Sequence, residues 1–166
     1  RLFHYITWPR FLLELLLYVD DSLFTGHDQP SIEEILFGIW FLTSLGVPWA
    51  WRKFRGGNCL SWVGLWVSWS EYRLGVSAAR AAWIRTWLEG KLACGSVELR
   101  ELSGVLGRMS FAAMALALVR PFLSPLFAWV AARGYTGEVA LPRAVRFLFT
   151  LLRDSFSEDR RVAHVP

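Results

Sequence analysis

Two short apolar runs near the start of the chain predict a β-hairpin. Residues 13–20 (LELLLYVD) and 22–26 (SLFTG) are mostly apolar, and the acidic pair Asp20 and Asp21 lies where the runs join. Aspartate favours turns because its side chain bonds to nearby backbone, so a plain turn is one interpretation of the pair. Carboxylates held between two strands can also bind a divalent cation, and this interpretation stays open beside the first.

The pattern then changes to the spacing of a helix. Apolar residues recur every three or four positions, at Ile32, Ile35, Leu36, Ile39, Leu42 and Leu45. Ser31 and Glu34 have the spacing of a capping box, and Gly46 suits a left-handed C-cap. We therefore expect a helix over residues 31–46.

A second, aromatic-rich hairpin is predicted after this helix. Residues 49–54 (WAWRKF) and 59–69 (CLSWVGLWVSW) carry aromatic side chains, which suit the pleated surface of a sheet. The RGGN stretch between them contains Gly56 and Gly57, which adopt positive φ without steric cost. Residues 72–77 (YRLGVS) predict one further strand.

Helical patterns dominate the rest of the chain. They predict three helices, at 77–90, 96–119 and 141–156. Their boundaries follow from residues that favour helix ends, namely Ser77, Gly90, Ser96 and Pro142. Because strands come first and helices later, we expect an α+β protein with two regions, residues 1–76 and 77–166.

Composition supports a folded chain and limits the choice of partner. Apolar residues make up 54% of the sequence and aromatic residues 16%, which is enough to bury a core. The net charge of +4 is compatible with a polyanionic partner without establishing one. Cys59 and Cys94 have no metal-ligand spacing, and we expect both to be buried.

The mean hydropathy of +0.34 raises the possibility of a membrane protein. Residues 35–51 lack charge but are interrupted by Gly46 and Pro48, which leaves less than the roughly 20 residues that span a bilayer. Residues 109–132 contain Arg120 near the centre, which costs about 2.5–3.5 kcal/mol on insertion. A small integral membrane protein is therefore the less favoured alternative, and a non-catalytic helical interaction module is another.

The residues Tyr18-Val19-Asp20-Asp21 resemble the YxDD box of reverse transcriptases. The segments after this box are similar in order as well: a helix, residues 45–54 (LGVPWAWRKF), and a glycine-containing hairpin ending at 62–69 (WVGLWVSW). Residues 99–127 are similar to the thumb or connection region of retroelement polymerases, particularly the DIRS-like kind that encodes a tyrosine recombinase. The resemblance implies a partial polymerase palm, made of antiparallel hairpins plus a helix, followed by an all-helical thumb or connection.

The resemblance also implies a catalytic set. Asp20 is expected to be a direct ligand of Mg²⁺ (or Mn²⁺), with Asp21 as the second metal-binding carboxylate. Two such ions stabilise both the attacking and the leaving oxygen in an in-line phosphoryl transfer. Lys53 corresponds to a lysine that protonates or neutralises the pyrophosphate leaving group, although it could also belong to a solvated basic segment beside Arg52 and Arg55.

Six further residues are expected to contact the RNA/DNA template–primer: Tyr18, Trp62, Gly64, Trp66, Arg80 and Arg85. Tyr18 would pack beneath the primer terminus or a template base, and Trp62, Gly64 and Trp66 match a hairpin called the primer grip. The two arginines lie on the first thumb helix, where they would neutralise phosphates. Core packing or a solvated helix face is the alternative interpretation for each of them.

The sequence departs from the family in what precedes the box. Only residues 1–17 precede the box in this chain, and Glu14 would share a strand with the box. We therefore expect the third catalytic carboxylate, and the fingers that bind the incoming dNTP, to lie outside this chain. We therefore expect a fragment of an RNA-directed DNA polymerase that is inactive alone. As a retroelement protein it would be intracellular, in the nucleus or the cytoplasm.

Overall fold

The computed structural model describes residues 14–18, 21–26 and 29–164, and their contacts divide the chain after Arg55 into two units, residues 1–55 and 56–166. Both units contain helices and antiparallel strands, which confirms the α+β class. The sequence pattern predicted a change of region at 76 and 77, whereas the structure groups strands 59–76 with the helices. The physical reason is that hydrogen bonds join these strands to Ser77, which caps the helix beginning at Ala78, and to the C-terminal segment.

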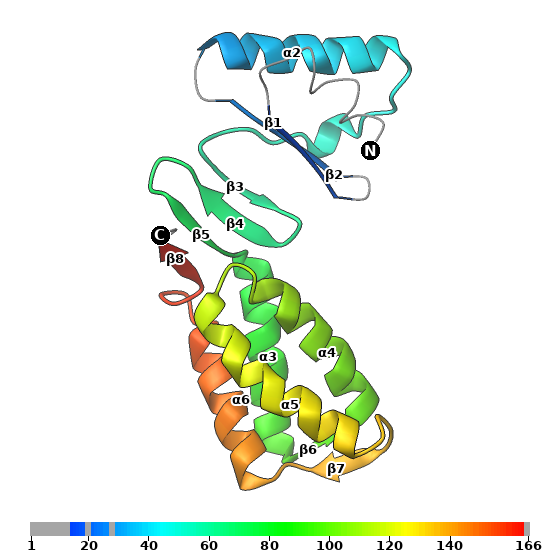
Figure 1. Ribbon diagram of the computed structural model, residues 1–166, viewed down its shortest axis with the longest axis vertical. Helices are drawn as coiled ribbons and strands as arrows, with labels where there is room; N and C mark the ends of the chain where they lie inside the picture. The colour runs from blue at the N-terminus through cyan, green and yellow to red at the C-terminus, as the bar shows by residue number, and fades with distance from the viewer. Residues whose placement is uncertain (1–13, 19–20, 27–28, 165–166) are drawn as a thin grey trace. The chain divides into compact units, whose positions relative to one another are not determined.

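The 1–55 unit is built on a hairpin and a helix (Figure 1). Strand β1 (Glu14–Tyr18) pairs with β2 (Asp21–Thr25) in an antiparallel register that runs from Glu14 opposite Thr25 to Tyr18 opposite Asp21. This agrees with the predicted hairpin. Helix α2 (Gln29–Ser44) begins before Ser31, so Ser31 lies inside the first turn and does not cap the helix as predicted.

The end of α2 has the left-handed cap that the sequence predicted. Gly46 has φ 83°, its N–H donates to the Thr43 carbonyl at 2.9 Å, and the Val47 N–H donates to the Leu42 carbonyl at 3.1 Å. This pair of bonds defines a Schellman motif, in which glycine avoids the clash of a side chain in the left-handed region. The motif turns the chain sharply into the segment that carries Lys53.

Residues 49–54 were predicted to form a strand, and this prediction is wrong. Residues Trp51–Lys53 form a single 3-10 turn, η1, around an aromatic cluster. The Trp49 ring lies 6.4 Å from the rings of both Phe24 and Phe54, and its indole N–H donates to the Thr43 hydroxyl at 3.0 Å. Aromatic packing around Trp49 therefore replaces strand pairing, and it connects β2, α2 and η1 within the unit.

The 56–166 unit has a four-stranded antiparallel sheet at one end of a helical bundle (Figure 1). The sheet order is β3 (Cys59–Trp62), β4 (Leu65–Ser68), β5 (Arg73–Val76) and β8 (Val162–His164). Strand β5 is the one predicted from YRLGVS. Strand β8 was not predicted, because three residues carry too little periodicity to recognise.

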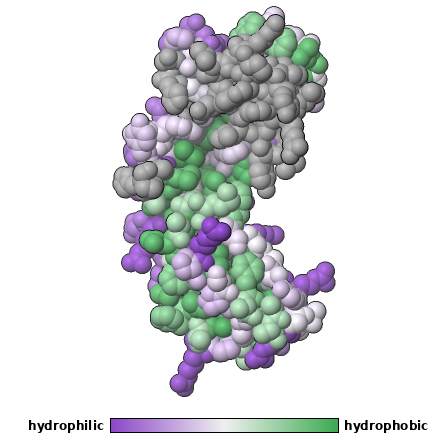
Figure 2. Space-filling model, viewed as in Figure 1, coloured by the Kyte–Doolittle hydropathy of each residue, from purple (hydrophilic) through white to green (hydrophobic). Residues whose placement is uncertain are grey.

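Four α-helices form the bundle: α3 (Ala78–Cys94), α4 (Leu99–Ala112), α5 (Arg120–Ala132) and α6 (Arg143–Ser155), with the 3-10 turn η2 (Ala117–Val119) between α4 and α5. Helix α3 packs on α6, and α4 packs on α5. The core between them is apolar, with Leu88, Leu106 and Phe149 fully buried. Figure 2 shows the outside of this part, where hydrophilic side chains stand out singly from a surface that is otherwise pale or green.

Several helix ends differ from the predictions. Ser77 caps α3 as expected, its side chain accepting the Arg80 N–H, but α3 runs past Gly90 to Cys94 and ends on the left-handed Gly95. Ser96 does not cap the next helix, because Ser96–Glu98 forms strand β6, which pairs with β7 (Glu138–Ala140). The cap of α4 is Glu98, whose carboxylate accepts from two backbone N–H groups at 3.1 and 2.5 Å. The described residues of this region, 77–164, therefore hold three short strands beside their helices.

Both cysteines are exposed and free, so the prediction that they are buried is wrong. Cys59 begins the outer strand β3 and lies 3.2 Å from the Ser68 hydroxyl. Cys94 is the last residue of α3 and lies 3.3 Å from the Ser96 hydroxyl. Each stands at the end of an element, where the core does not cover it.

Candidate functional site

The acidic pair is the first part of the predicted site. Asp21 is the first residue of β2, lies opposite Tyr18 in the register, and has an exposed side chain. The prediction for Asp20 falls outside the described residues. An exposed carboxylate at the end of a hairpin is accessible to a cation, and the short strands on either side limit where it can move.

The donor type suits Mg²⁺, which prefers carboxylate and water oxygens. Among the residues that the structure describes, no cluster of three or more His, Cys, Asp or Glu side chains could hold a metal. Within this part Asp21 offers one carboxylate, and Asp20 beside it in the sequence would offer another. The residues present therefore fit a partial oxygen-ligand set that needs further ligands to be complete.

Lys53 ends the η1 turn, and its side chain is exposed. The aromatic cluster around Trp49 connects this turn to β2, the strand that Asp21 begins, because Trp49 contacts both Phe24 and Phe54. The side chain of Lys53 has no ion-pair partner within the described ranges. Lys53 therefore supplies an exposed positive charge in the same unit as Asp21.

Trp62, Gly64 and Trp66 lie at the tip of the β3–β4 hairpin. The sequence predicted that 49–54 would pair with 59–69, but the hairpin forms inside the second run, with Val63 (φ 53°) and Gly64 (φ 80°) as the turn. Two successive positive φ values are typical of the type I′ turn that joins twisted antiparallel strands. Gly64 fits this turn without strain.

The two tryptophans of this hairpin face opposite sides of the sheet. Trp62 lies opposite Leu65, so the two share a face, and Trp66 as the next residue after Leu65 lies on the other. Leu65 in turn lies opposite the fully buried Val76, which places Trp62 on the core-facing side. The structure therefore places Trp62 and Trp66 on opposite faces of the hairpin.

Gly64 and Arg80, which are far apart in the pattern of the sequence, do come together. The Ser77 N–H donates to the Gly64 carbonyl at 3.0 Å, so the hairpin turn rests on the start of α3. A Cβ added at Gly64 would lie 2.7 Å from Nη1 of Arg80. The Arg80 guanidinium also lies 5.0 Å from the centre of the Phe111 ring. A side chain at this position would therefore displace the Arg80 guanidinium and would be strained at the positive φ of Gly64.

Arg85 is not part of this arrangement. It lies five residues after Arg80, which places it on a different side of α3, and it pairs with Glu89 at 3.5 Å. The sequence analysis did not identify Arg108 of α4 as a candidate for binding nucleic acid. Its guanidinium lies 4.8 Å from the centre of the Trp83 ring on α3. The spacing of three residues in both Arg80–Trp83 and Arg108–Phe111 is a signal that could have identified it.

Charge is divided unequally between the two units. Residues 56–166 contain thirteen Lys and Arg but eight Asp and Glu, whereas residues 1–55 contain five and six. Five of the eight acidic side chains in 56–166 are in ion pairs with nearby basic residues, at Glu71, Glu89, Glu101, Asp154 and Glu158. The surplus of arginine therefore belongs to the unit that carries the hairpin and the bundle.

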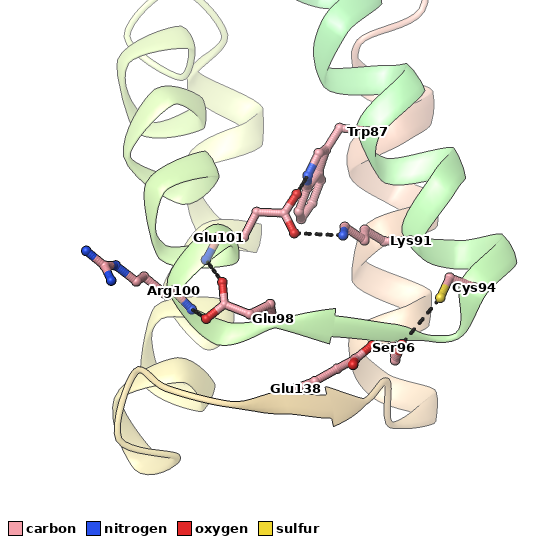
Figure 3. A network of polar contacts seen from close by, with 8 residues as sticks. All are labelled: Trp87, Lys91, Cys94, Ser96, Glu98, Arg100, Glu101 and Glu138. Carbon is pink, nitrogen blue, oxygen red and sulfur yellow. Dashed lines mark hydrogen bonds and ion pairs between the residues drawn. The ribbon is translucent and has the colours of Figure 1, made fainter.

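One polar network connects α3 to α4 (Figure 3). The Lys91 ammonium lies 2.7 Å from a carboxylate oxygen of Glu101, and the Trp87 indole N–H donates to the other oxygen at 2.5 Å. These hydrogen bonds, first that of Lys91 and then that of Trp87, hold the pKa of Glu101 below its ordinary value. The network links the two helices and pairs the charges of Lys91 and Glu101.

No family model, curated protein or solved structure matches this chain. None of the helices within the described ranges is both long enough and apolar enough to cross a bilayer.

Proposed function

We propose that this chain supplies the catalytic hairpin of the palm and the thumb of a reverse transcriptase, an enzyme that extends a primer on an RNA or DNA template. The observation that carries the proposal is the Tyr18-Val19-Asp20-Asp21 sequence at the hairpin of β1 and β2, where Tyr18 lies opposite an exposed Asp21. The order of the elements after it supports the same proposal: a helix, a turn with Lys53, a glycine hairpin, and a bundle.

In the proposed reaction the primer 3′ hydroxyl would lose its proton to water and its oxygen would attack the α-phosphorus of a dNTP. A new O–P bond would form as the bond from that phosphorus to the bridging oxygen of the β-phosphate breaks, and pyrophosphate would leave. Asp20 and Asp21 would hold Mg²⁺ (or Mn²⁺) through their carboxylates. When bound, such ions stabilise the negative charge on the attacking and leaving oxygens. Lys53 would donate a proton or a compensating charge to the pyrophosphate.

The basic 56–166 unit supports a role in gripping the template–primer. Arg80 and Arg108 stack on aromatic rings and have no carboxylate partner in the described part of the chain. Such guanidinium groups are available for phosphates, and each phosphate neutralised releases counterions. Duplex binding by this unit is therefore expected to weaken steeply as salt rises.

The experiment joins this chain to the fingers and the upstream palm strand of a polymerase of the same kind. We expect primer extension by the joined enzyme, none by the 166-residue chain alone, and a loss of about a thousandfold or more in rate with Asp20→Asn. Glu33→Gln, which removes an exposed carboxylate of α2, is the matched control and should leave the rate unchanged. Extension that survives Asp20→Asn would contradict the proposal.

A further inference from the structure

The C-terminal segment returns to the sheet as strand β8, which pairs with β5 (Figure 1). In the β5–β8 register, Gly75 lies opposite Val162 and Leu74 opposite Ala163. A Cβ added at Gly75 would clash with the Arg161 carbonyl oxygen and would lie 2.8 Å from the Val162 Cα. Both are backbone atoms that cannot turn aside, so glycine is required for this contact.

Arg161 anchors the segment with both its backbone and its side chain. The Val76 N–H donates to the Arg161 carbonyl at 2.8 Å, and Nη1 of Arg161 donates to the Val76 carbonyl at 3.0 Å. The rest of the guanidinium donates to a carboxylate oxygen of Glu158, at 2.9 Å from Nε and 2.5 Å from Nη2. The Arg161 side chain is only 13% exposed, so it has little surface left for a phosphate.

The same guanidinium covers Trp66. Its Cζ lies 5.9 Å from the centre of the Trp66 ring, within the range of a cation–π contact. Trp66 lies opposite Gly75, and the missing side chain of Gly75 leaves the space that the C-terminal segment enters. The hairpin is therefore held at two points, by the Ser77 N–H at its turn and by Arg161 at Trp66.

We propose that Arg161 is a positioning residue that fixes the Trp66 ring for stacking on a terminal base of bound nucleic acid. The proposal rests on the proposed function, from which the hairpin takes its nucleic-acid partner. An aromatic ring whose orientation is fixed by a largely buried cation stacks on a base with less loss of conformational freedom than a mobile ring. The C-terminal segment, which the sequence did not link to any site, then forms part of the grip.

The test uses the full 166-residue chain and an RNA–DNA duplex with 2-aminopurine at the primer 3′ end. Stacking on an aromatic ring quenches the fluorescence of this base, and the anisotropy of a separate dye on the duplex reports affinity. We expect the chain to quench 2-aminopurine on binding, and Trp66→Leu to abolish the quenching. Arg161→Gln should reduce the quenching at saturation about threefold or more, since it removes charged hydrogen bonds and the cation over the ring.

Arg160→Gln is the matched control, because it removes the same charge from the neighbouring, exposed position. It should leave the quenching at saturation unchanged, and Arg161→Lys should restore part of what Arg161→Gln loses. Glu158→Gln serves where Arg161→Gln does not fold: it removes an exposed partner of the guanidinium, and we expect a partial loss of quenching with an unchanged melting temperature.

Three results would overturn the inference. Full quenching with Arg161→Gln, or with Glu158→Gln where the first variant is unfolded, would show that Trp66 is positioned without Arg161. Equal losses with Arg161→Gln and Arg160→Gln would reduce the role of Arg161 to net charge. Absence of any duplex binding by the unaltered chain is distinguishable from both, because it would remove the proposed function and this inference together.

Discussion

Helices α2 and α6 are of similar length, but they differ in where their apolar residues go. Helix α6 buries one side completely, with Val145, Phe149 and Leu152 in the core of the 56–166 unit. On α2, by contrast, Ile32, Leu36 and Trp40 follow one another at a spacing of four and are 49%, 62% and 61% exposed. Burial of such side chains is worth about 1.5–3 kcal/mol each, so α6 gains a stabilisation that this side of α2 does not.

The comparison extends to the two units. The core of residues 56–166 is continuous across all four helices, and caps and ion pairs fix the helix ends. In the described part of residues 1–55, the buried apolar side chains are Leu23, Ile39 and Leu42. The difference teaches that a strong apolar pattern does not by itself produce a core, because burial also needs a second surface of matching size.

The largest expected effect tests this difference directly. Phe149→Ala should lower the free energy of unfolding of the 56–166 unit by about 3–5 kcal/mol, because it leaves a cavity at a fully buried position. Leu36→Ala on α2 should change stability by less than about 0.5 kcal/mol. Urea unfolding followed by circular dichroism measures both. Similar losses from the two variants would mean that the exposed side of α2 is covered in solution.

The glycines that end α2 and α3 allow the same comparison between the two units at a helix terminus. Gly46 ends α2 at φ 83°, and Gly95 ends α3 at φ 77°. Alanine in this left-handed conformation costs about 1–2 kcal/mol, and at Gly95 the added Cβ would also displace the Arg146 guanidinium. We expect Gly95→Ala to lower the free energy of unfolding in the main transition by about that amount, and Gly46→Ala to leave this free energy unchanged. Hydrogen exchange of α2 should detect the Gly46→Ala effect, and its appearance in the main transition would show that the units unfold together.

Much of the fold could be predicted where a local signal decided the structure. The left-handed cap at Gly46 and the N-cap at Ser77 depend on the residue itself, and both were predicted correctly. Gly90 misled because a single exposed glycine inside a helix costs only about 1 kcal/mol, which the packing of α3 outweighs. The strand predicted for residues 49–54 was wrong because aromatic side chains can also be buried by packing on one another, here around Trp49.

The candidate site was predictable in its residue types and not in its spatial relations. The sequence identified Gly64 and Arg80 separately, but the contact between them depends on the register of β3 and β4 and on the start of α3. The register also separates Trp62 from Trp66, because a shift of one residue moves a side chain to the opposite face. The role of Arg161 depends on a pairing of distant segments, which no local pattern encodes.

A helix cap in the 56–166 unit provides a test with a smaller expected effect. Glu98 accepts the N–H groups of Arg100 and Glu101 at the start of α4, so Glu98→Ala should lower the free energy of unfolding by about 1 kcal/mol. Glu89→Ala is the control, because its ion pair with Arg85 is exposed and spans 3.5 Å, and it should cost less than about 0.5 kcal/mol. Equal effects in chemical unfolding would mean that the loss of charge, and not the cap, decides the result.

The smallest expected effect concerns pH and the network in Figure 3. The hydrogen bonds from Lys91 and Trp87 hold the pKa of Glu101 below its ordinary value in the folded chain. A carboxyl whose pKa is lower in the folded state stabilises that state above the pKa of the unfolded chain, about 4.3, and loses this contribution as pH falls through the folded-state value. Because the Glu101 side chain is 40% exposed, the contribution should stay below about 1 kcal/mol.

Glu101→Gln should therefore flatten the fall in stability between about pH 4.3 and lower pH, and change the slope at neutral pH very little. The Trp87 indole N–H can still donate to the amide oxygen, so the variant isolates the charge of the Lys91–Glu101 pair from the hydrogen bond of Trp87. Thermal unfolding across this pH range, repeated in high salt, measures the effect, since salt weakens an exposed pair. An acid slope that is identical in Glu101→Gln and the unaltered chain would mean that the charge of the Lys91–Glu101 pair contributes nothing to the pH dependence of stability.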